Sequence, residues 1–318
     1  MNAIVTGCAG FIGSHLTERL LKEGFNVVGI DNFSDFYPKE AKEKNLESAI
    51  KNPRFILIKK DILNMRFCGL IENMDYVFHL AAQPGVRPSW GENFEIYVRN
   101  NILATQKLLE ACKDTKIKKF IYASSSSVYG NAETSWFGMS EDRAPKPISP
   151  YGVSKLAGEQ LCSLYLINFG IPTVILRYFS VYGERQRPDM AFHKFIKSAL
   201  KGEKIKVYGD GSQTRDFTYI SDVIDATMSA INSNVKGKTI NVGGGCRITV
   251  NETITLLEPL LGSEISVNYV ETQKGDAKDT FASINMARRL LNYSPKVELA
   301  EGLRREIEWI KSLSSDQA

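Results

Sequence analysis

The sequence predicts an α/β fold in which a doubly wound parallel sheet is followed by a smaller C-terminal α/β region. Short apolar runs rich in β-branched residues alternate with amphipathic helical stretches along the first half of the chain. These runs are nearly continuous in apolar residues, which is typical of parallel strands covered on both faces. After about residue 180 the segments shorten and glycine-containing turns become frequent. We therefore expect one unit over residues 1–180 and a second over 181–318, whose later segments can return to the first.

The expected elements follow one another in strand–helix order. Strands are expected at residues 3–5, 25–30, 55–58, 76–80, 120–123 and 173–176. Helices are expected at residues 12–22, 39–51 and 92–113, and a further helix begins at Tyr151. Pro150 directly before Tyr151 suits the start of that helix.

The composition is that of an ordinary globular protein. Of the 318 residues, 43% are hydrophobic and 24% are charged, which argues against extensive disorder. The net charge is +4 with both signs interspersed, so no basic stripe indicates a nucleic-acid partner. The cysteines and histidines show no metal-ligand spacing, so no metal is expected. Without a signal-peptide pattern or an apolar run of roughly 18 residues, we expect a cytoplasmic protein that does not enter a membrane.

A glycine-rich segment, Thr6–Gly13 (TGCAGFIG), lies between the first expected strand and the first helix. Its glycines allow a tight turn, a close approach to a pyrophosphate and close packing of helix on strand. The helix that follows offers amides and the positive end of its dipole to phosphates. Asp31 ends the second strand, where a carboxylate accepts hydrogen bonds from a ribose diol and repels a 2′-phosphate. This Rossmann-type pattern predicts NAD rather than NADP, with a turn or capping role as the alternative for Asp31.

Further cofactor contacts are expected where the next strands end. Asp61 and Ile62 can reach an adenine, although a plain turn is the alternative. Small residues after the fourth strand suit a backbone that lies close to a flat cofactor, although simple packing also explains them. The candidates for cofactor binding at this point are Gly7, Gly10, Phe11, Ile12, Gly13, Asp31, Asn32, Asp61, Ile62, Leu80, Ala81 and Ala82.

Tyr151 and Lys155 stand four residues apart on an expected helix and therefore share one of its faces. An ammonium beside a phenol favours the phenolate, so we expect the pKa of Tyr151 to lie below its usual value of about 10. Tyr151 then becomes a candidate base. The serine run at 124–127 lies at the carboxyl end of a strand, which is the ligand edge of an open α/β sheet. A surface helix and a serine-rich turn are the alternatives.

Together these residues resemble the extended short-chain dehydrogenases/reductases, and within them the nucleotide-sugar 4-epimerases. The resemblance covers nearly the whole chain and includes the glycine turn, the segment 79–82, Asn100, the serine run, Tyr151 with Lys155, and the segment 209–217. It implies that Ser125 is the catalytic hydroxyl, that Asn100 contacts the cofactor, and that Lys155 holds the nicotinamide ribose. It also implies NAD binding mainly by residues 1–180 and nucleotide-sugar binding mainly by residues 181–318.

Two positions depart from the family pattern. Ser180 stands where the family often has an asparagine that contacts a phosphate. Gln273 and Lys274 precede Asp276 where many members carry a phosphate-binding arginine, and the sequence leaves open whether either replaces it. We therefore expect Arg215 to carry more of the diphosphate charge and Asp276 to face the nucleoside ribose.

Within the family, simple epimerisation is favoured. The related 4,6-dehydratases carry Asp-Glu after the catalytic residue, and the decarboxylases usually have Glu there, whereas this chain has Ser126 and Ser127. Tyr151 would take the proton of the sugar 4-hydroxyl, Ser125 would hydrogen-bond the same oxygen, and a 4-keto sugar would form transiently. A nucleotide-sugar reductase, a decarboxylase and a noncatalytic NAD-binding sensor remain as alternatives.

For the sugar, the segments 83–87 and 182–190 resemble the branch that converts UDP-glucuronate to UDP-galacturonate. A C6 carboxylate would find backbone amides at Gly85 and Val86, the hydroxyls of Ser126 and Ser127, and Arg187, since arginine binds carboxylates in a bidentate manner. The substrate-binding residues we expect are Gly85, Val86, Arg87, Ser125, Ser126, Ser127, Tyr151, Ser180, Arg187, Arg215 and Asp276. The alternative is a 4-epimerase of UDP-glucose or a UDP-N-acetylhexosamine, in which these arginines bind only phosphate or lie at the surface.

The family also tends to dimerise through two helices of each subunit. Here these helices correspond to residues 100–112 and 151–168. A homodimer is therefore expected.

Overall fold

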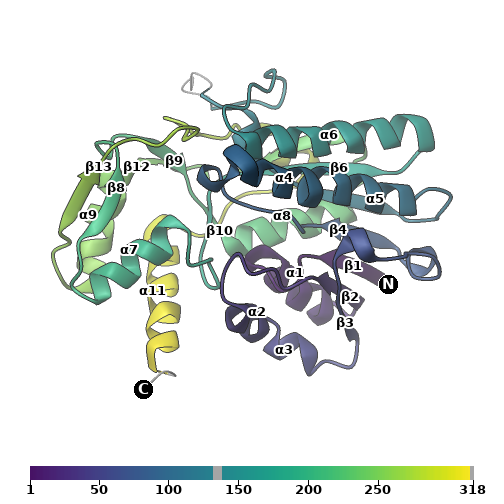
Figure 1. Cartoon of the computed structure of the whole chain (residues 1–318), viewed down its shortest axis with the longest axis horizontal. Helices are drawn as coiled ribbons and strands as arrows, with labels where there is room; N and C mark the ends of the chain where they lie inside the picture. The colour runs from purple at the N-terminus through teal and green to yellow at the C-terminus, as the bar shows by residue number, and fades with distance from the viewer. Residues whose placement is uncertain (132–137, 316–318) are drawn as a thin grey trace.

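The computed structural model describes residues 1–131 and 138–315 and is organised around one seven-stranded parallel sheet (Figure 1). The strand order is β11-β6-β5-β4-β1-β2-β3. The strands are β1 (Asn2–Thr6), β2 (Asn26–Asp31), β3 (Phe55–Lys59), β4 (Tyr76–His79), β5 (Lys119–Ser125), β6 (Thr173–Tyr178) and β11 (Lys238–Val242). The predicted α/β class and the six strands predicted within residues 1–180 are confirmed.

Both faces of the sheet are buried, as the continuous apolar runs predict. In β1, Ala3 and Val5 belong to one apolar cluster and Ile4 to the other, because successive side chains point to opposite faces. The helices α1 (Phe11–Lys22) and α8 (Ile220–Asn232) cover the first face, whereas α5 (Ala104–Ala111) and α6 (Pro150–Phe169) cover the second. These layers are visible in Figure 1.

The helix predicted at 92–113 is not one regular helix. It consists of a 3₁₀ turn at Gly91–Asn93, α4 (Phe94–Tyr97), a π-helical segment (Val98–Leu103) and then α5. The π segment holds Asn100 and Asn101, and such irregular turns are frequent at functional sites. The helix predicted at 39–51 is likewise divided into α2 (Lys39–Asn45) and α3 (Glu47–Ile50) by Leu46, whose buried side chain accompanies a backbone with ψ of 0°.

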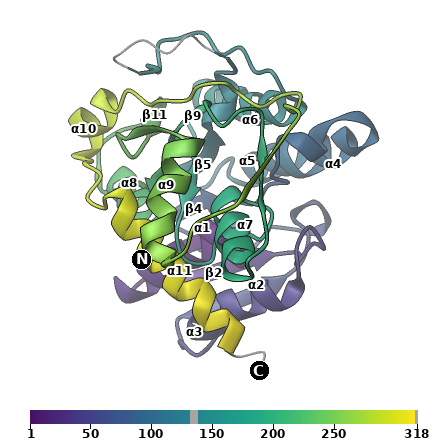
Figure 2. The same ribbon diagram turned by 90° about the vertical axis from the view of Figure 1, so that its left-hand side faces the viewer.

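Chain after residue 180 contributes both to the main sheet and to a smaller lobe. β11 pairs with β6 in parallel and forms one edge of the main sheet. Three two-stranded sheets are built from β7 (Val181–Tyr182) with β10 (Thr218–Tyr219), β9 (Thr214–Asp216) with β12 (Arg247–Thr249), and β8 (Ile205–Tyr208) with β13 (Val267–Val270). The remaining helices are α7 (Ala191–Leu200), α9 (Val250–Leu261), α10 (Asn285–Leu291) and α11 (Leu299–Ser315). Among these, α7, α9 and α11 pack together, as Figures 1 and 2 show.

The start of α6 is fixed by its local sequence. The Ser149 hydroxyl accepts a hydrogen bond from the Gly152 amide at 3.1 Å, and Pro150 occupies the first turn, where no amide partner is needed. The helix ends at Gly170, whose left-handed conformation suits glycine. These signals set the helical positions of Tyr151 and Lys155.

Within the described ranges, no helix is long and apolar enough to cross a membrane.

Candidate active site

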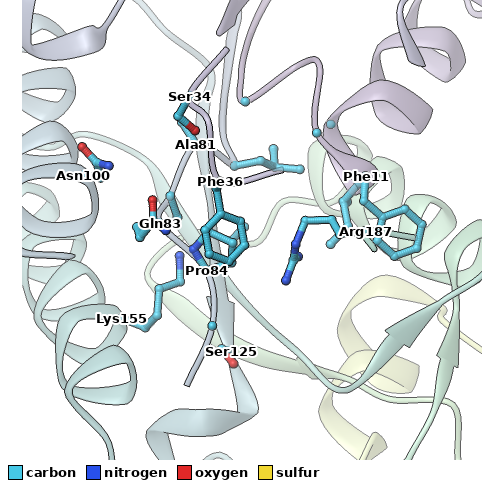
Figure 3. Close-up of a pocket in the computed structure, with 18 of the residues that line it drawn as sticks. Phe11, Ser34, Phe36, Ala81, Gln83, Pro84, Asn100, Ser125, Lys155 and Arg187 are labelled. Carbon is cyan, nitrogen blue, oxygen red and sulfur yellow. The ribbon is translucent and has the colours of Figure 1, made fainter. Parts of the chain in front are cut away.

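A cavity of about 390 Å³ opens at the carboxyl ends of the central strands. Lys155 and Asn100 lie on one side of it, and Phe11 and Arg187 on the other (Figure 3). The predicted site residues that line it are Gly7, Gly10, Phe11, Ile12, Gly13, Asp31, Asn32, Asp61, Ile62, Leu80, Ala81, Ala82, Gly85, Val86, Asn100, Ser125, Ser126, Ser127, Tyr151, Lys155, Ser180 and Arg187. All the predicted cofactor-binding residues and eight of the eleven predicted substrate-binding residues therefore line one cavity.

The glycine turn between β1 and α1 is required by close contacts. A Cβ atom on Gly13 would lie 2.0 Å from the Gly7 oxygen, and one on Gly7, whose φ is +70°, would lie 2.8 Å from the Ala81 nitrogen. A Cβ on Gly10 would contact only the Gly7 oxygen, at 3.2 Å, so the space beside Gly10 is otherwise open. Because the first amides of α1 have no partner within the helix, the turn is suited to a diphosphate.

Asp31 lies at the end of β2 in the same cavity. Its Oδ2 accepts a hydrogen bond from the Ala9 amide at 3.1 Å and its Oδ1 accepts one from the Phe33 amide at 2.8 Å. These bonds fix the carboxylate, and each oxygen retains a lone pair for another donor. Next to it, Lys42 donates to the Ser34 oxygen at 2.6 Å, and both of these residues line the cavity although sequence reasoning missed them. The cavity therefore fits a nucleotide that presents a diphosphate and a ribose diol.

A buried hydrogen-bond chain supports the floor beside the glycine turn. The Thr6 hydroxyl accepts from the Ala81 amide at 3.1 Å and donates to Nδ1 of His79 at 2.8 Å. Nε2 of His79 then donates to the Thr105 hydroxyl at 2.9 Å, which in turn donates to the Asn101 oxygen. Burial lowers the pKa of His79 to about 3, so the ring is neutral, as this chain requires. His79 thus holds strands and helix together.

Ser125, Tyr151 and Lys155 meet on one wall of the cavity. Burial raises the pKa of Tyr151 above its usual value, while hydrogen bonding to Ser125 and the charge of Arg187 oppose the rise. The predicted lowering of the pKa of Tyr151 by Lys155 is therefore wrong in direction, because desolvation of the phenolate outweighs the favourable charges. The Lys155 ammonium lies 4.7 Å from the centre of the Tyr122 ring, and burial lowers its pKa to about 8.

Asn101 is a structural residue of the site that sequence reasoning missed. Its amide group exchanges two hydrogen bonds with the backbone of Gln83, at 2.6 and 3.0 Å, and donates to the Ser154 hydroxyl at 2.9 Å. It thereby joins the π-helical segment, the loop after β4 and α6. An asparagine on the apolar face of an expected helix was the only available signal.

Arg187 lines the cavity as predicted, but it already has a partner. Its Nε and Nη2 donate to the two oxygens of Asp189 at 2.9 and 3.0 Å. The guanidinium also lies 5.9 Å from the ring centre of Phe36, another lining residue that sequence reasoning missed. Since a guanidinium has five N–H donors, further donors remain for a ligand in the cavity.

Arg87, Arg215 and Asp276 do not line this cavity and instead form a neighbouring cluster. Arg87 pairs with Asp276 at 2.8 Å and stacks on Tyr208, with 3.8 Å from its guanidinium carbon to the ring centre. Arg215 donates to the backbone oxygens of Thr214 and Lys278, at 2.8 and 3.2 Å. The charges of Asp276 and Arg87 act on Arg215, so the three predicted residues are close together. Gln273 and Lys274 are exposed in the turn before Asp276.

The chain is similar to known proteins over nearly its whole length. The sequence model of the NAD dependent epimerase/dehydratase family matches residues 3–243. An uncharacterized UDP-glucose epimerase, YtcB, of Bacillus subtilis is 46% identical over 315 residues, which cover 98% of this chain and 99% of that protein. The UDP-glucuronate 4-epimerase of Thermodesulfobacterium geofontis is 40% identical over 313 residues, which cover 97% and 95%.

The solved structures agree in fold over nearly the whole chain. UDP-glucuronic acid 4-epimerase from Bacillus cereus, in complex with UDP-glucuronic acid and NAD, is 50% identical with a TM-score of 0.96. The match covers 98% of this chain and 100% of that one. MoeE5 in complex with UDP-glucose and NAD is 39% identical with a TM-score of 0.87, and the match covers 99% and 100%.

The contrast between Gly10 and Gly13 gives a first prediction. We expect Gly10→Ala to fold, with a Tm within about 3 °C of the parent, but to lose most of the NAD that copurifies with it. The added methyl group would stand in the open space where a diphosphate approaches the turn. Cofactor released on denaturation and identified by mass spectrometry is the measurement.

Gly13→Ala is the matched comparison, because its methyl group would collide with backbone. We expect this variant to be destabilised as a protein, whereas Gly10→Ala is impaired only in cofactor content. A Gly10→Ala protein that retains one NAD per chain would contradict the placement of the diphosphate, and release of NADP alone by the parent would contradict the role of Asp31.

Proposed function

This chain belongs to the NAD dependent epimerase/dehydratase family, and we propose that it interconverts UDP-glucuronate and UDP-galacturonate by inverting C4 of the sugar. The observation that carries the proposal is the single cavity in which Ser125, Tyr151 and Lys155 stand beside the glycine turn. Arg187 lies across the same space from Ser125 and Lys155 (Figure 3). The cavity thereby combines a base (Tyr151), a hydroxyl donor (Ser125), the glycine turn for a cofactor and an arginine for a carboxylate (Arg187).

NAD fits the first part of this cavity. Residues Gly7, Gly10 and Gly13 with the start of α1 would hold the diphosphate, and Asp31 would hold the adenine ribose. Asp61, Ile62 and the residues 80–82 line the space further along. When bound, NAD supplies the two-electron oxidation at C4 and its reversal.

The chain's own residues manage the proton of the 4-hydroxyl. The phenolic oxygen of Tyr151 would take this proton as the 4-keto sugar forms and return it when the sugar is reduced on its other face. The Ser125 hydroxyl would donate a hydrogen bond to the same oxygen. The ammonium of Lys155 would favour the phenolate against the desolvation that raises the pKa of Tyr151.

A carboxylate at C6 explains the remaining polar groups of the cavity. Gly85, Val86, Ser126 and Ser127 line its sugar end together with Arg187, which retains N–H donors beyond those engaged by Asp189. Oxidation of a glucuronate at C4 gives a β-keto acid, which loses carbon dioxide when the bond to the carboxylate aligns with the carbonyl π system. A fixed set of donors would hold the carboxylate out of that alignment.

The nucleotide would extend toward the smaller lobe. We propose that Arg215 contacts the diphosphate, that Asp276 faces the nucleoside ribose and that Ser180 lies on the path between cavity and lobe. The proximity of Arg87, Arg215 and Asp276 supports this proposal. It assigns residues 1–180 mainly to the cofactor and residues 181–318 mainly to the nucleotide sugar.

UDP-glucose is a second candidate substrate. The name of the Bacillus subtilis relative and the complex of MoeE5 with UDP-glucose support it. In that case Arg187 would contact phosphate only, and no carboxylate would compete for it with Asp189.

We also propose a homodimer in the cytoplasm. Ile96 and Leu103 are 43% and 47% exposed, and on the neighbouring α6 Leu164 and Ile167 are 52% and 79% exposed. Such apolar side chains on adjoining helices suit a second copy of the chain. The five cysteines are free thiols, which suits a reducing compartment.

Replacement of the base tests the mechanism. We expect Tyr151→Phe to lower kcat by about 10²–10⁴ while the protein still copurifies with NAD, because the phosphate and ribose contacts are unchanged. Turnover is followed by separating the UDP-sugar epimers, and NAD is measured after denaturation. Activity like that of the parent would overturn the role of Tyr151.

A panel of UDP-sugars tests the substrate. We expect the purified protein to convert UDP-glucuronate to UDP-galacturonate without added NAD and with a kcat/KM at least about tenfold above that for UDP-glucose, because only the acid can engage Arg187 through its carboxylate. A UDP-glucose rate equal to or above the UDP-glucuronate rate would refute the proposal.

Within the same panel, Arg187→Ala separates the two roles of the arginine. A carboxylate ligand predicts weaker binding of UDP-glucuronate and some decarboxylated UDP-pentose, with little change for UDP-glucose. A phosphate ligand predicts an equal loss for both sugars.

Light scattering tests the dimer. We expect a mass near twice 35.6 kDa at micromolar concentration, and Ile167→Glu should shift it toward the single chain because a charge would be buried in the apolar contact. A single-chain mass for the parent would contradict the dimer.

A further inference from the structure

A buried ion pair joins β6 to α6, the helix that carries Tyr151 and Lys155. Nε and Nη2 of Arg177 on β6 donate to the two oxygens of Glu159 on α6, at 2.8 and 2.6 Å. The two side chains are only 5% and 3% exposed. A bidentate pair fixes the orientation of both side chains, because the two hydrogen bonds form together only when the guanidinium and the carboxylate lie in one plane.

Glu159 is connected to both parts of the reaction centre. Its Oε1 accepts a hydrogen bond from the Ser124 hydroxyl at 2.5 Å, and Ser124 directly precedes Ser125 on β5. On α6, Glu159 follows Lys155 by four residues, which places the two side chains on one helical face. One carboxylate therefore bridges the strand that carries Ser125 and the helix that carries Lys155.

Stability alone does not account for this pair. The free energy needed to remove two charges from water offsets much of the attraction between them. Apolar residues of similar volume often stabilise such a position as well or better. A carboxylate four residues from a buried ammonium has a further effect, however, because it favours the charged form of the lysine. That effect is of use only where Lys155 has to be cationic.

The surroundings of Lys155 contain few other charges. Glu159 and Cys162 from α6 act on it, the ring of Tyr122 from β5 lies beneath its ammonium, and His79 from β4 is neutral. On α6 itself, Tyr151 stands one turn before it. Burial lowers the pKa of Lys155 to about 8 and Glu159 is the largest opposing influence. Among the described residues, Glu159 is thus the main support for the positive charge.

We propose that Glu159 is a positioning residue of the reaction centre, which fixes the Ser125 strand through Ser124 and places its negative charge on the helical face of Lys155, with Arg177 holding Glu159 in place. The proposal rests on the proposed function, in which the Lys155 ammonium supports the Tyr151 phenolate. It assigns to the pair a role in catalysis that its burial alone would not suggest.

The variants separate the effect of the Glu159 charge on Lys155 from its effect on the stability of the protein. Glu159→Gln alone leaves Arg177 charged and buried without its partner, so a marked loss of Tm is expected. The double variant Glu159→Gln, Arg177→Met removes both charges and should recover most of that Tm. Glu159→Asp keeps the negative charge, and Glu308→Gln, on the exposed face of α11, is a control for loss of one carboxylate.

Two measurements are made on the NAD-loaded protein. The first is the titration of Lys155 by NMR in protein labelled with 13C-lysine, with the resonance assigned by its absence from Lys155→Met. The second is the pH dependence of kcat. In the double variant we expect the midpoint of Lys155 to fall by about one pH unit, the alkaline limb of kcat to move with it, and kcat near pH 8 to fall about fivefold. Glu159→Asp and Glu308→Gln should keep the parental midpoint.

A double variant that folds stably with an unchanged Lys155 midpoint and pH profile would overturn the proposal and leave the pair a purely structural one. Because the NMR titration uses no sugar, it decides the effect of Glu159 on Lys155 even if UDP-glucuronate is not the substrate. A shifted midpoint with an unchanged kcat profile would instead contradict the role of the Lys155 ammonium in turnover.

Discussion

The parallel direction of all seven strands is the constraint on which the site depends. Each strand of the main sheet pairs in parallel with its neighbours, so all their carboxyl ends meet at one edge. The glycine turn follows β1, Asp31 ends β2, and Ser125 ends β5. Residues far apart in sequence are thereby delivered to one cavity without any long excursion of the chain. The type of residue at the end of each strand then determines which side chain or turn lines the cavity.

Burial is the second shared influence, and it acts against the charged forms that the chemistry uses. It raises the pKa of Tyr151 and lowers that of Lys155, so both groups are biased toward neutrality. Favourable charges at either end of the cavity oppose this bias, with Arg187 facing Tyr151 and Glu159 behind Lys155. The charged neighbours of Tyr151 and Lys155 therefore partly offset the effect of burial on this phenol–lysine pair.

Features that depend on neighbouring residues could be predicted from the sequence, whereas features that depend on contacts between distant segments could not. The β1–α1 turn and the Tyr151–Lys155 spacing depend on adjacent residues, and these placements follow from periodicity and turn chemistry. The edge strand β11 was missed because its partner is β6, and a short apolar run does not indicate which strand it joins. The π-helical segment was also missed, and its Asn101 bonds to Gln83 and Ser154, contacts that no local pattern indicates. The expected pKa of Tyr151 failed because burial cannot be read from a four-residue spacing.

The loop that carries Arg187 is fixed by contacts with α1. Arg185 adopts a left-handed backbone with φ of +65° and pairs with Glu18, and the preceding Glu184 oxygen bonds to His15 at 2.9 Å. Glu18 and His15 both belong to α1, whose first turn forms the glycine cradle. A strained residue is retained only where its surroundings fix it, and here two side chains of α1 do so. The same helix therefore begins at the glycine turn and holds, through His15 and Glu18, the loop that carries Arg187.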